Sequence, residues 1–370
     1  MKFKVFIISF FLLLPAGVVY ADGHGRAETQ KIERSIAALP NVAVSICVDS
    51  GNVTVRGWDK NEVFARSSEV GRIELKGANS GMPSNAAAKV LVWLVDKHIG
   101  VEEKGGCDAF GDVELMVPRG AALYLQTGDG TIDVSDVASI FARSETGDIL
   151  IKKATRSVEA VSFSGEIAVA NSTGRMAIKS VSGVLTAANL RPTELSDSFE
   201  ASTISGDIEL EGVDHQLVTV KTANGKIDFS GPLAHQGRYN FNTTSSDVTL
   251  SLPENSSFRL NARVARDREV VSDFPLNLTI EDPVPTKPKK TPAPPAPPAP
   301  AAQPISGATP DAKEPVIVIV DPQQKTIQVK PVVLKTLYSL RRISAWHGNG
   351  DALITIASFT GTLHLIDTGN

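Results

Sequence analysis

Four aspartates beside short turns are the residues whose spacing first suggests chemistry. Asp129, Asp148, Asp207 and Asp247 each lie in or next to a turn built from Gly or Ser. A repeated Gly-x-Asp arrangement is typical of calcium-binding β-rolls, but those sites need a full "GGxGxD" and a second half-site, and the chain has neither. We therefore expect each of these carboxylates to accept a hydrogen bond within its own turn.

Other catalytic and binding patterns also fail on position or spacing. The stretch "TGDGTID" (residues 127–133) resembles a phosphate loop, yet it leads into another strand-like segment and not into a helix. Serines are common, but no Gly-x-Ser-x-Gly elbow with Asp and His partners can be traced. No metal-ligand spacing connects the six histidines, which stand at positions 24, 98, 215, 235, 347 and 364. The sequence thus predicts a non-enzymatic protein with no metal and no cofactor.

The glycines of these turns recur at a regular interval, and this indicates the fold. Successive turn positions are separated by 17, 18, 18, 23, 19 and 21 residues, and apolar residues alternate with polar ones on both sides of each turn. A period near twenty residues with two short strands per unit predicts an all-β, parallel β-helix or β-solenoid, because each unit buries its apolar face only by stacking on its neighbours. The turn positions are Gly130, Gly147, Gly165, Gly183, Gly206 and Gly225, with Ser246 in the seventh place.

A hydroxyl residue stands three positions before each turn residue. Stacking would place these side chains on one another as an inward ladder, where they can hydrogen-bond along the stack or to the turn backbone. The glycines would supply a positive φ at the bend. Outward positions such as Glu159, Lys179, Glu200 and Lys221 would form either a solvated face or a binding surface. The predicted ladder consists of Thr127, Ser144, Ser162, Ser180, Thr203, Thr222 and Thr243.

The two ends of the chain differ in composition from the repeats. Two lysines, an apolar run over residues 5–14 and small residues before position 22 predict a secretory signal peptide cleaved after Ala21. The mature chain would then be exported to the periplasm, the cell surface or the medium, with no later membrane span. The predicted organisation is a signal peptide (1–21), an N-terminal lead-in (22–41), a solenoid (42–280), a proline-rich linker (281–315) and a C-terminal β segment (316–370).

Two boundary segments leave alternatives open. Residues 28–39 suit either a short helix or a strand lead-in. After the semi-rigid proline-rich spacer, the stretch "ITIASFTGTLHL" (residues 354–365) carries the same repeat signature around Gly361. These C-terminal strands would add to the main stack, form a separate small sheet or pair with another chain.

Cysteines and charge constrain the environment and the partners. Cys47 and Cys107 are the two cysteines, and in an oxidising compartment they form either one disulfide or two separate thiols. The net charge of −4 is mixed along the chain, so nothing in it favours nucleic acid as a partner. Aromatic residues are sparse, from which we expect little tight stacking on sugars and a broad, multivalent contact instead.

Three stretches resemble a known family. "VSICVDSGNVTVRGWDKNEVFARSS", "VELMVPRGAALYLQTGDGTIDVSDV" and "FNTTSSDVTLSLPENSSFRLNARV" are similar, in this order, to the bacterial putative-adhesin family of β-strand repeats, over residues 42–275. The resemblance implies a β-helix-like solenoid without catalytic residues and an adhesin or envelope interaction module that binds a glycan or a protein. Two alternatives remain: a scaffold that self-assembles through its strand edges, and a carbohydrate-active β-helix enzyme.

Overall fold

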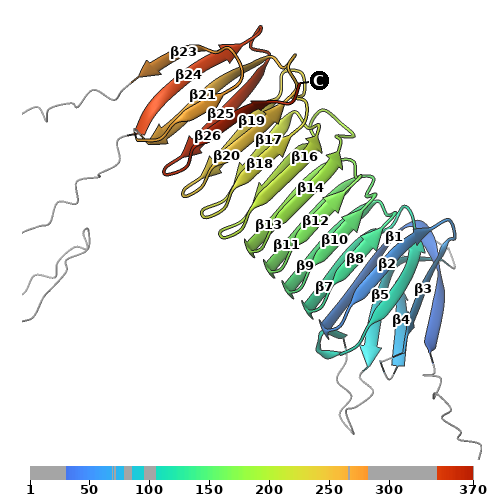
Figure 1. The fold of residues 1–370 in the computed structure, drawn as a ribbon. Helices are drawn as coiled ribbons and strands as arrows, with labels where there is room; N and C mark the ends of the chain where they lie inside the picture. The colour runs from blue at the N-terminus through green and yellow to red at the C-terminus, as the bar shows by residue number, and fades with distance from the viewer. Residues whose placement is uncertain are drawn as a thin grey trace, which may run out of the picture.

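The computed structural model describes residues 31–68, 70, 72–78, 86–95, 106–265, 267–281 and 340–369. The expected signal peptide, the linker from residue 282 onward and residues 316–339 of the C-terminal segment lie outside these residues. The described chain forms a long stack of short strands, with its N-terminal strands at one end and its C-terminal strands at the other (Figure 1).

The strands make two sheets that face each other across the core. Sheet A contains, in spatial order, β3 (Glu62–Ser67), β6 (Val113–Pro118), β2 (Val53–Trp58), β8 (Ile132–Ser135), β10 (Ile149–Lys152), β12 (Ile167–Ala170), β14 (Leu185–Leu190), β16 (Ile208–Val213), β18 (Ile227–Ser230), β20 (Val248–Leu252), β26 (Leu363–Asp367) and β22 (Val270–Ser272). Sheet B contains β4 (Arg72–Ala78), β5 (Ala87–Val95), β1 (Ile32–Ser50), β7 (Ala122–Asp129), β9 (Ser139–Thr146), β11 (Ser157–Ser164), β13 (Arg175–Ser182), β15 (Ser198–Ser202), β17 (Leu217–Lys221), β19 (Arg238–Thr243), β25 (Ala352–Ser358), β21 (Phe258–Ala265), β24 (Leu340–His347) and β23 (Asn277–Glu281).

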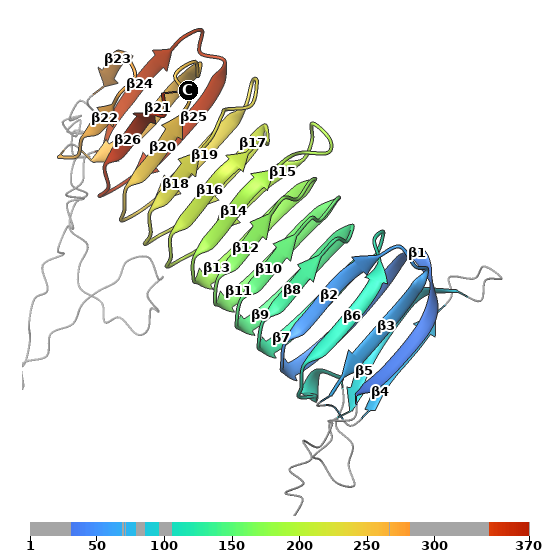
Figure 2. The same ribbon diagram turned by 45° about the vertical axis from the view of Figure 1, so that its right-hand side comes forward.

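The middle of the stack is the predicted solenoid. From β7 to β20 the chain winds through seven successive coils, each with one strand in sheet B, a turn, and one strand in sheet A (Figure 2). Every strand in this region pairs in parallel with the equivalent strand of the next coil. The prediction of an all-β solenoid is confirmed, because the period-two alternation of each strand leaves its apolar face no partner except the opposite sheet.

The N-terminal coil does not stand where chain order would place it. β1 pairs with both β5 and β7, and β2 pairs with both β6 and β8, so this first coil lies between two later ones. Residues 32–37 extend β1 across to sheet A, where they pair antiparallel with β3. The segment 28–39 is therefore a strand, not a helix, from Ile32 onward. β3 and β4 run antiparallel to their neighbours and close this end of the stack.

The C-terminal strands are likewise inserted between strands that come earlier in the chain. β25 lies between β19 and β21 in sheet B, and β26 lies between β20 and β22 in sheet A. β24 pairs antiparallel with β21 on one side and with β23 on the other. Of the three arrangements that the sequence left open, the described C-terminal strands adopt the first, since they are part of the main stack.

The core changes character along the rod. The first coils are filled by Val, Ile, Leu and Ala, whereas aromatic rings occupy the later ones. Phe229 packs edge-on against Tyr239 and Phe241, with ring centroids 5.6 and 5.7 Å apart. All three rings are fully buried. Edge-to-face pairs of this kind stabilise a core beyond the area they bury, so the aromatic coils are expected to hold the C-terminal half together.

One histidine lies inside this core. His215 is fully buried, packs against Phe199 at a ring distance of 6.2 Å and donates from Nε2 to the carbonyl oxygen of Gly174 at 2.8 Å. Burial lowers the pKa of His215, an effect that this hydrogen bond and the nearby carboxylates of Asp197 and Asp214 partly oppose. The residue therefore serves the core in its neutral form.

Candidate functional site

The turn glycines lie directly on one another. A Cβ atom built on any of the six would lie 1.8–2.3 Å from the carbonyl oxygen of the glycine one coil earlier. Five of them have φ between 131° and 152°, but Gly225 is not in the positive-φ region. The expectation that positive φ is the reason for glycine is therefore wrong at Gly225. The requirement that all six share is the close approach of two backbones.

The hydroxyl residues at the −3 positions are all buried and stacked beside this glycine row. Thr222 and Thr243 donate to the carbonyl oxygens of Gly206 and Gly225, at 3.2 and 3.4 Å. Within the described residues, the hydroxyls of Ser144, Ser162, Ser180 and Thr203 have no hydrogen-bond partner. The row serves packing at a tight corner and offers no accessible nucleophile.

The turn aspartates bond between coils and not within their own turns. Asp148 Oδ1 accepts from the backbone N–H of Glu166 at 2.8 Å, and Asp207 Oδ1 accepts from that of Lys226 at 2.8 Å. Asp247 does the same with Thr362, at 2.7 Å. The expectation of hydrogen bonds inside the turn is wrong for these residues, because the next coil brings its amide closer. Each carboxylate instead links one coil to the next.

Cys47 and Cys107 are joined in a disulfide. The bond ties the short 3₁₀ helix η1 (Gly106–Asp108) to β1, with the two Cα atoms 4.5 Å apart. Backbone hydrogen bonds continue the attachment, since Asp49 N–H donates to the carbonyl of Ala109 at 2.9 Å. The disulfide therefore fastens the connection before β6 onto the inserted N-terminal coil.

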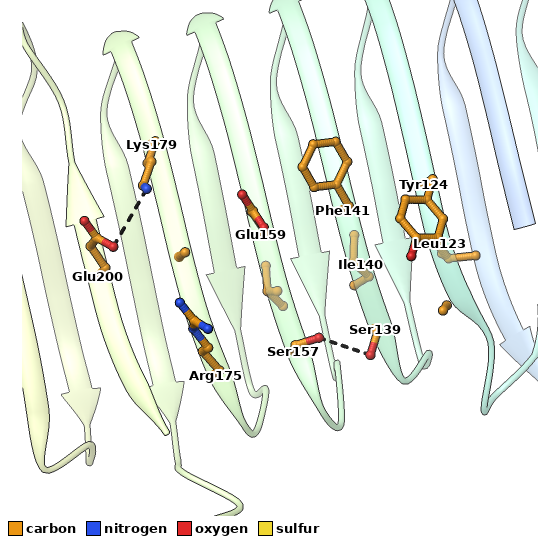
Figure 3. Close-up of a pocket in the computed structure, with 13 residues that line it drawn as sticks. Leu123, Tyr124, Ser139, Ile140, Phe141, Ser157, Glu159, Arg175, Lys179 and Glu200 are labelled. Atoms are coloured by element: carbon orange, nitrogen blue, oxygen red, sulfur yellow. Dashed lines mark hydrogen bonds and ion pairs between the residues drawn. The ribbon is translucent and has the colours of Figure 1, made fainter. Parts of the chain in front are cut away.

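A groove on the outer face of sheet B is a candidate binding site for a ligand (Figure 3). Its volume is about 350 Å³, and it crosses β7, β9, β11, β13 and β15. Its charged and aromatic lining comes from outward positions of successive coils. These side chains are Tyr124, Phe141, Glu159, Arg175, Lys179 and Glu200.

The register places several of these residues in a single row. Tyr124, Phe141, Glu159, Ala177 and Glu200 are direct neighbours across four strand pairs. Two strand spacings, about 9–10 Å, therefore separate the two glutamates. Because the side chain of Ala177 between them is short, the groove is deeper at this point.

Strand β13 supplies the cations of the groove. Arg175 and Lys179 stand on either side of Ala177 and project outward from the same strand (Figure 3). Lys179 Nζ lies 3.8 Å from a carboxylate oxygen of Glu200. No salt bridge to Arg175 or Glu159 is found in the part of the chain that the structure describes. One cation and one carboxylate thus stay available to a ligand that carries charge or hydroxyl groups.

The aromatic pair at the other end of the groove went unrecognised in the sequence. Tyr124 and Phe141 are 54% and 37% exposed, and their ring centroids lie 6.4 Å apart. We expected few exposed aromatics, yet these two lie side by side. The signal was present, because both occupy the outward place between two inward apolar residues in consecutive repeats.

The family follows from a match that spans most of the repeat region. Residues 28–266 match the family model described as Toastrack DUF4097. The chain belongs to the Toastrack DUF4097 family. No curated protein matches it in sequence.

Three solved structures are similar to this Toastrack chain at low identity. A putative adhesin from Parabacteroides distasonis is 10% identical, with a TM-score of 0.40 over 61% of this chain and 91% of that one. A putative cell adhesion protein from Clostridium sporogenes is 8% identical, with a TM-score of 0.20 over 92% of this chain and 100% of that one. A putative adhesin from Parabacteroides merdae is 8% identical, with a TM-score of 0.24 over 61% and 90%.

The opposite face of the Toastrack stack differs in charge. A hollow of about 410 Å³ on sheet A is lined by Glu209, Glu211 and Asp228 together with small or apolar residues, and no Lys or Arg is among its lining residues. Across the described ranges, no group of three or more His, Cys, Asp or Glu side chains is arranged to hold a metal ion. No helix there is long and apolar enough to cross a membrane.

Proposed function

We propose that this chain is an exported, non-enzymatic binding module, an adhesin or envelope interaction module, whose ligand lies on the outer face of sheet B. The observation that carries the proposal is the groove, where an exposed aromatic pair stands in one row with Glu159, Ala177 and Glu200. Aromatic and arginine side chains dominate the energetics of protein recognition sites. Both kinds are present here on a rigid sheet.

The stack suits a long ligand better than a compact one. Parallel pairing repeats the outward positions every 4.7–4.9 Å, so a groove over five strands extends about 19 Å from first to last. Tyr124 and Phe141 offer apolar ring faces at one end, and Arg175, Glu159 and Glu200 offer hydrogen-bonding groups at the other. An extended glycan or an extended peptide of a surface protein matches this sequence of groups.

The test is an array of glycans and matrix proteins probed with the mature chain, residues 22–370. Any ligand found would then be titrated against the Tyr124→Ala and Arg175→Ala variants. Loss of an anchor residue typically costs over 1 kcal/mol, so each should weaken binding about fivefold or more. Glu209→Ala, on the opposite face, is the matched control and should leave the affinity unchanged. Equal losses from the control and the groove variants would remove the groove as the site.

The two alternatives are separated by different measurements. Light scattering of the mature chain at high concentration tests the scaffold, and a strict monomer would exclude it. The carbohydrate-active enzyme is favoured by one observation, the two carboxylates of Glu159 and Glu200 across the deeper part of the groove. Release of reducing ends or unsaturated products from polysaccharides, abolished by Glu159→Gln, would establish it in place of a binding module.

A further inference from the structure

The last strands of the chain are interleaved with an earlier segment. Across the end of sheet B the order is β19, β25, β21, β24 and β23, so strands from residues 340–369 alternate with strands from residues 258–281 (Figure 1). Leu260 of β21, for example, has Ile354 as its parallel partner on one side and Ala345 as its antiparallel partner on the other. The C-terminal unit therefore holds β21 from both sides.

Without this unit the stack would contain a slot one strand wide. β20 and β21 follow each other in the chain, yet β25 and β26 separate their coils in both sheets. β25 and β26 fill the slot with buried apolar side chains, namely Ala352, Ile354, Ile356, Leu363 and Leu365. Ile343 and Ala345 of β24 are buried beyond β21, where β24 pairs with β21 and β23. An open slot would expose the backbone edges of four strands together with the apolar core, and both features favour capture of another strand.

The connection to the unit begins and ends at the same place. Glu281 of β23 is the register partner of Arg342 of β24, so the chain leaves and re-enters the described structure at one edge. Between them lie residues 282–339, and 14 of these 58 residues are proline. The composition of residues 282–304 predicts a polyproline spacer with a maximal reach of about 70 Å.

A long connection lowers the effective concentration of the chain's own C-terminal unit at its slot, and so its advantage over the unit of another copy. This maximal reach exceeds the length of sheet B, whose 14 strands among the described residues extend about 62 Å between the outermost two. A slot on a neighbouring copy is therefore within reach and offers the same contacts.

We propose that copies of this chain exchange their C-terminal units, with residues 340–369 of one copy filling the slot between β19/β20 and β21/β22 of another. The partner is a second copy, and the contacts are those of the closed chain made between molecules. The exchange is independent of the groove, which lies at β7–β15. Such linked copies would present several grooves on one assembly.

Two variants of the full mature chain, each with one cysteine added to the Cys47–Cys107 disulfide, test the exchange. Asn240 on β19 and Thr355 on β25 are register partners on the outer face of sheet B. At the usual strand spacing, cysteines in their places lie within disulfide range. Asn240→Cys and Thr355→Cys chains are unfolded together, refolded as a mixture and then mildly oxidised. Exchange predicts a covalent dimer on a non-reducing gel, in a fraction that rises with protein concentration during refolding.

Matched controls make each outcome decisive. Thr219→Cys on β17 stands one strand further away, so its mixture with Thr355→Cys should give no dimer. The double variant, with Asn240→Cys and Thr355→Cys in one chain, should close within the monomer at low concentration. Absence of a mixed dimer while the double variant closes would overturn the proposal, and so would equal dimer yields from Thr219→Cys and Asn240→Cys.

A second measurement covers the case in which the cysteines disturb the strand. The unmodified mature chain, refolded at rising concentration, should show a growing dimer mass by light scattering. Folded monomers that are merely mixed should stay monomeric, because exchange requires the unit to leave its slot. A chain that remains monomeric after refolding at every concentration contradicts the exchange.

Discussion

Replacement of a single turn glycine tests what holds the coils in contact. In Gly165→Ala, the new Cβ would lie 2.3 Å from the carbonyl oxygen of Gly147, and φ at this position is 137°. Holding an L-residue in that backbone region costs about 1–3 kcal/mol. The Cβ contact must also open by at least 0.7 Å to reach the 3.0 Å that real contacts respect. Overpacking of this kind costs a further 1–3 kcal/mol or so.

The two contributions together predict a loss of about 2–6 kcal/mol in the free energy of unfolding. For a domain of this size that corresponds to a fall in Tm of roughly 4–24 °C. Thermal unfolding followed by circular dichroism in the β-sheet band measures it directly. Ser164→Ala, in the same turn but exposed, should change Tm by no more than about 1–2 °C, since surface substitutions stay within about 0.5 kcal/mol.

A second glycine separates the two causes. Gly225 lies outside the positive-φ region, yet its Cβ would lie 1.8 Å from the carbonyl oxygen of Gly206. If close approach is the shared requirement, Gly225→Ala should still lower the free energy of unfolding by the overpacking contribution, about 1–3 kcal/mol, although backbone strain is absent there. A neutral Gly225→Ala beside a damaging Gly165→Ala would show that backbone strain alone decides, and two neutral variants would refute the stacking argument.

Further perturbations test the core, its histidine and the disulfide. Ile167→Asp buries an unpaired charge at a position with no exposure and should abolish the cooperative melt, whereas Glu159→Lys on the outer face should leave Tm unchanged. Because burial lowers the pKa of His215, the free energy of unfolding should fall as pH drops below about 6.5, where the unfolded chain takes up a proton first. His215→Gln should flatten that fall in urea titrations at stepped pH, and an unchanged slope would contradict the assignment. Replacing Cys47 and Cys107 by Ser should cost about 4 kcal/mol by loop entropy, and a loss below about 1 kcal/mol would show that the hydrogen bonds to β1 suffice.

Local pattern predicted the coil well. Alternation around Gly165 identified Val158, Ala160, Ile167 and Val169 as inward residues, and all four are buried. Such residues are predictable because the period of two depends only on strand geometry. The sequence did not predict why glycine is required at the turns. At Gly225 the backbone that excludes a Cβ atom belongs to the neighbouring coil.

In four coils, the left-handed residue of the second turn went unrecognised for a related reason. Asp136, Lys153, Asn171 and Asn189 adopt left-handed conformations, with φ between 51° and 62°. Asn and Asp tolerate this region, but they are also common in ordinary loops, so their types alone do not mark the bend. The groove was missed similarly, because Tyr124 and Phe141 are 17 residues apart and only pairing makes them neighbours.

The sequence by itself determined the repeat unit: two short strands, an inward apolar face, a turn glycine and a buried hydroxyl. It did not determine the order in which units stack. Every coil presents the same parallel strand edge and the same alternation of inward apolar residues. The local sequence pattern therefore does not specify which coil pairs with which. Only the tertiary structure decided that the first coil lies between β5/β6 and β7/β8 and that the last lies between β19/β20 and β21/β22. The physical reason is that antiparallel end strands and matched core side chains are properties of pairs of units, not of any one of them.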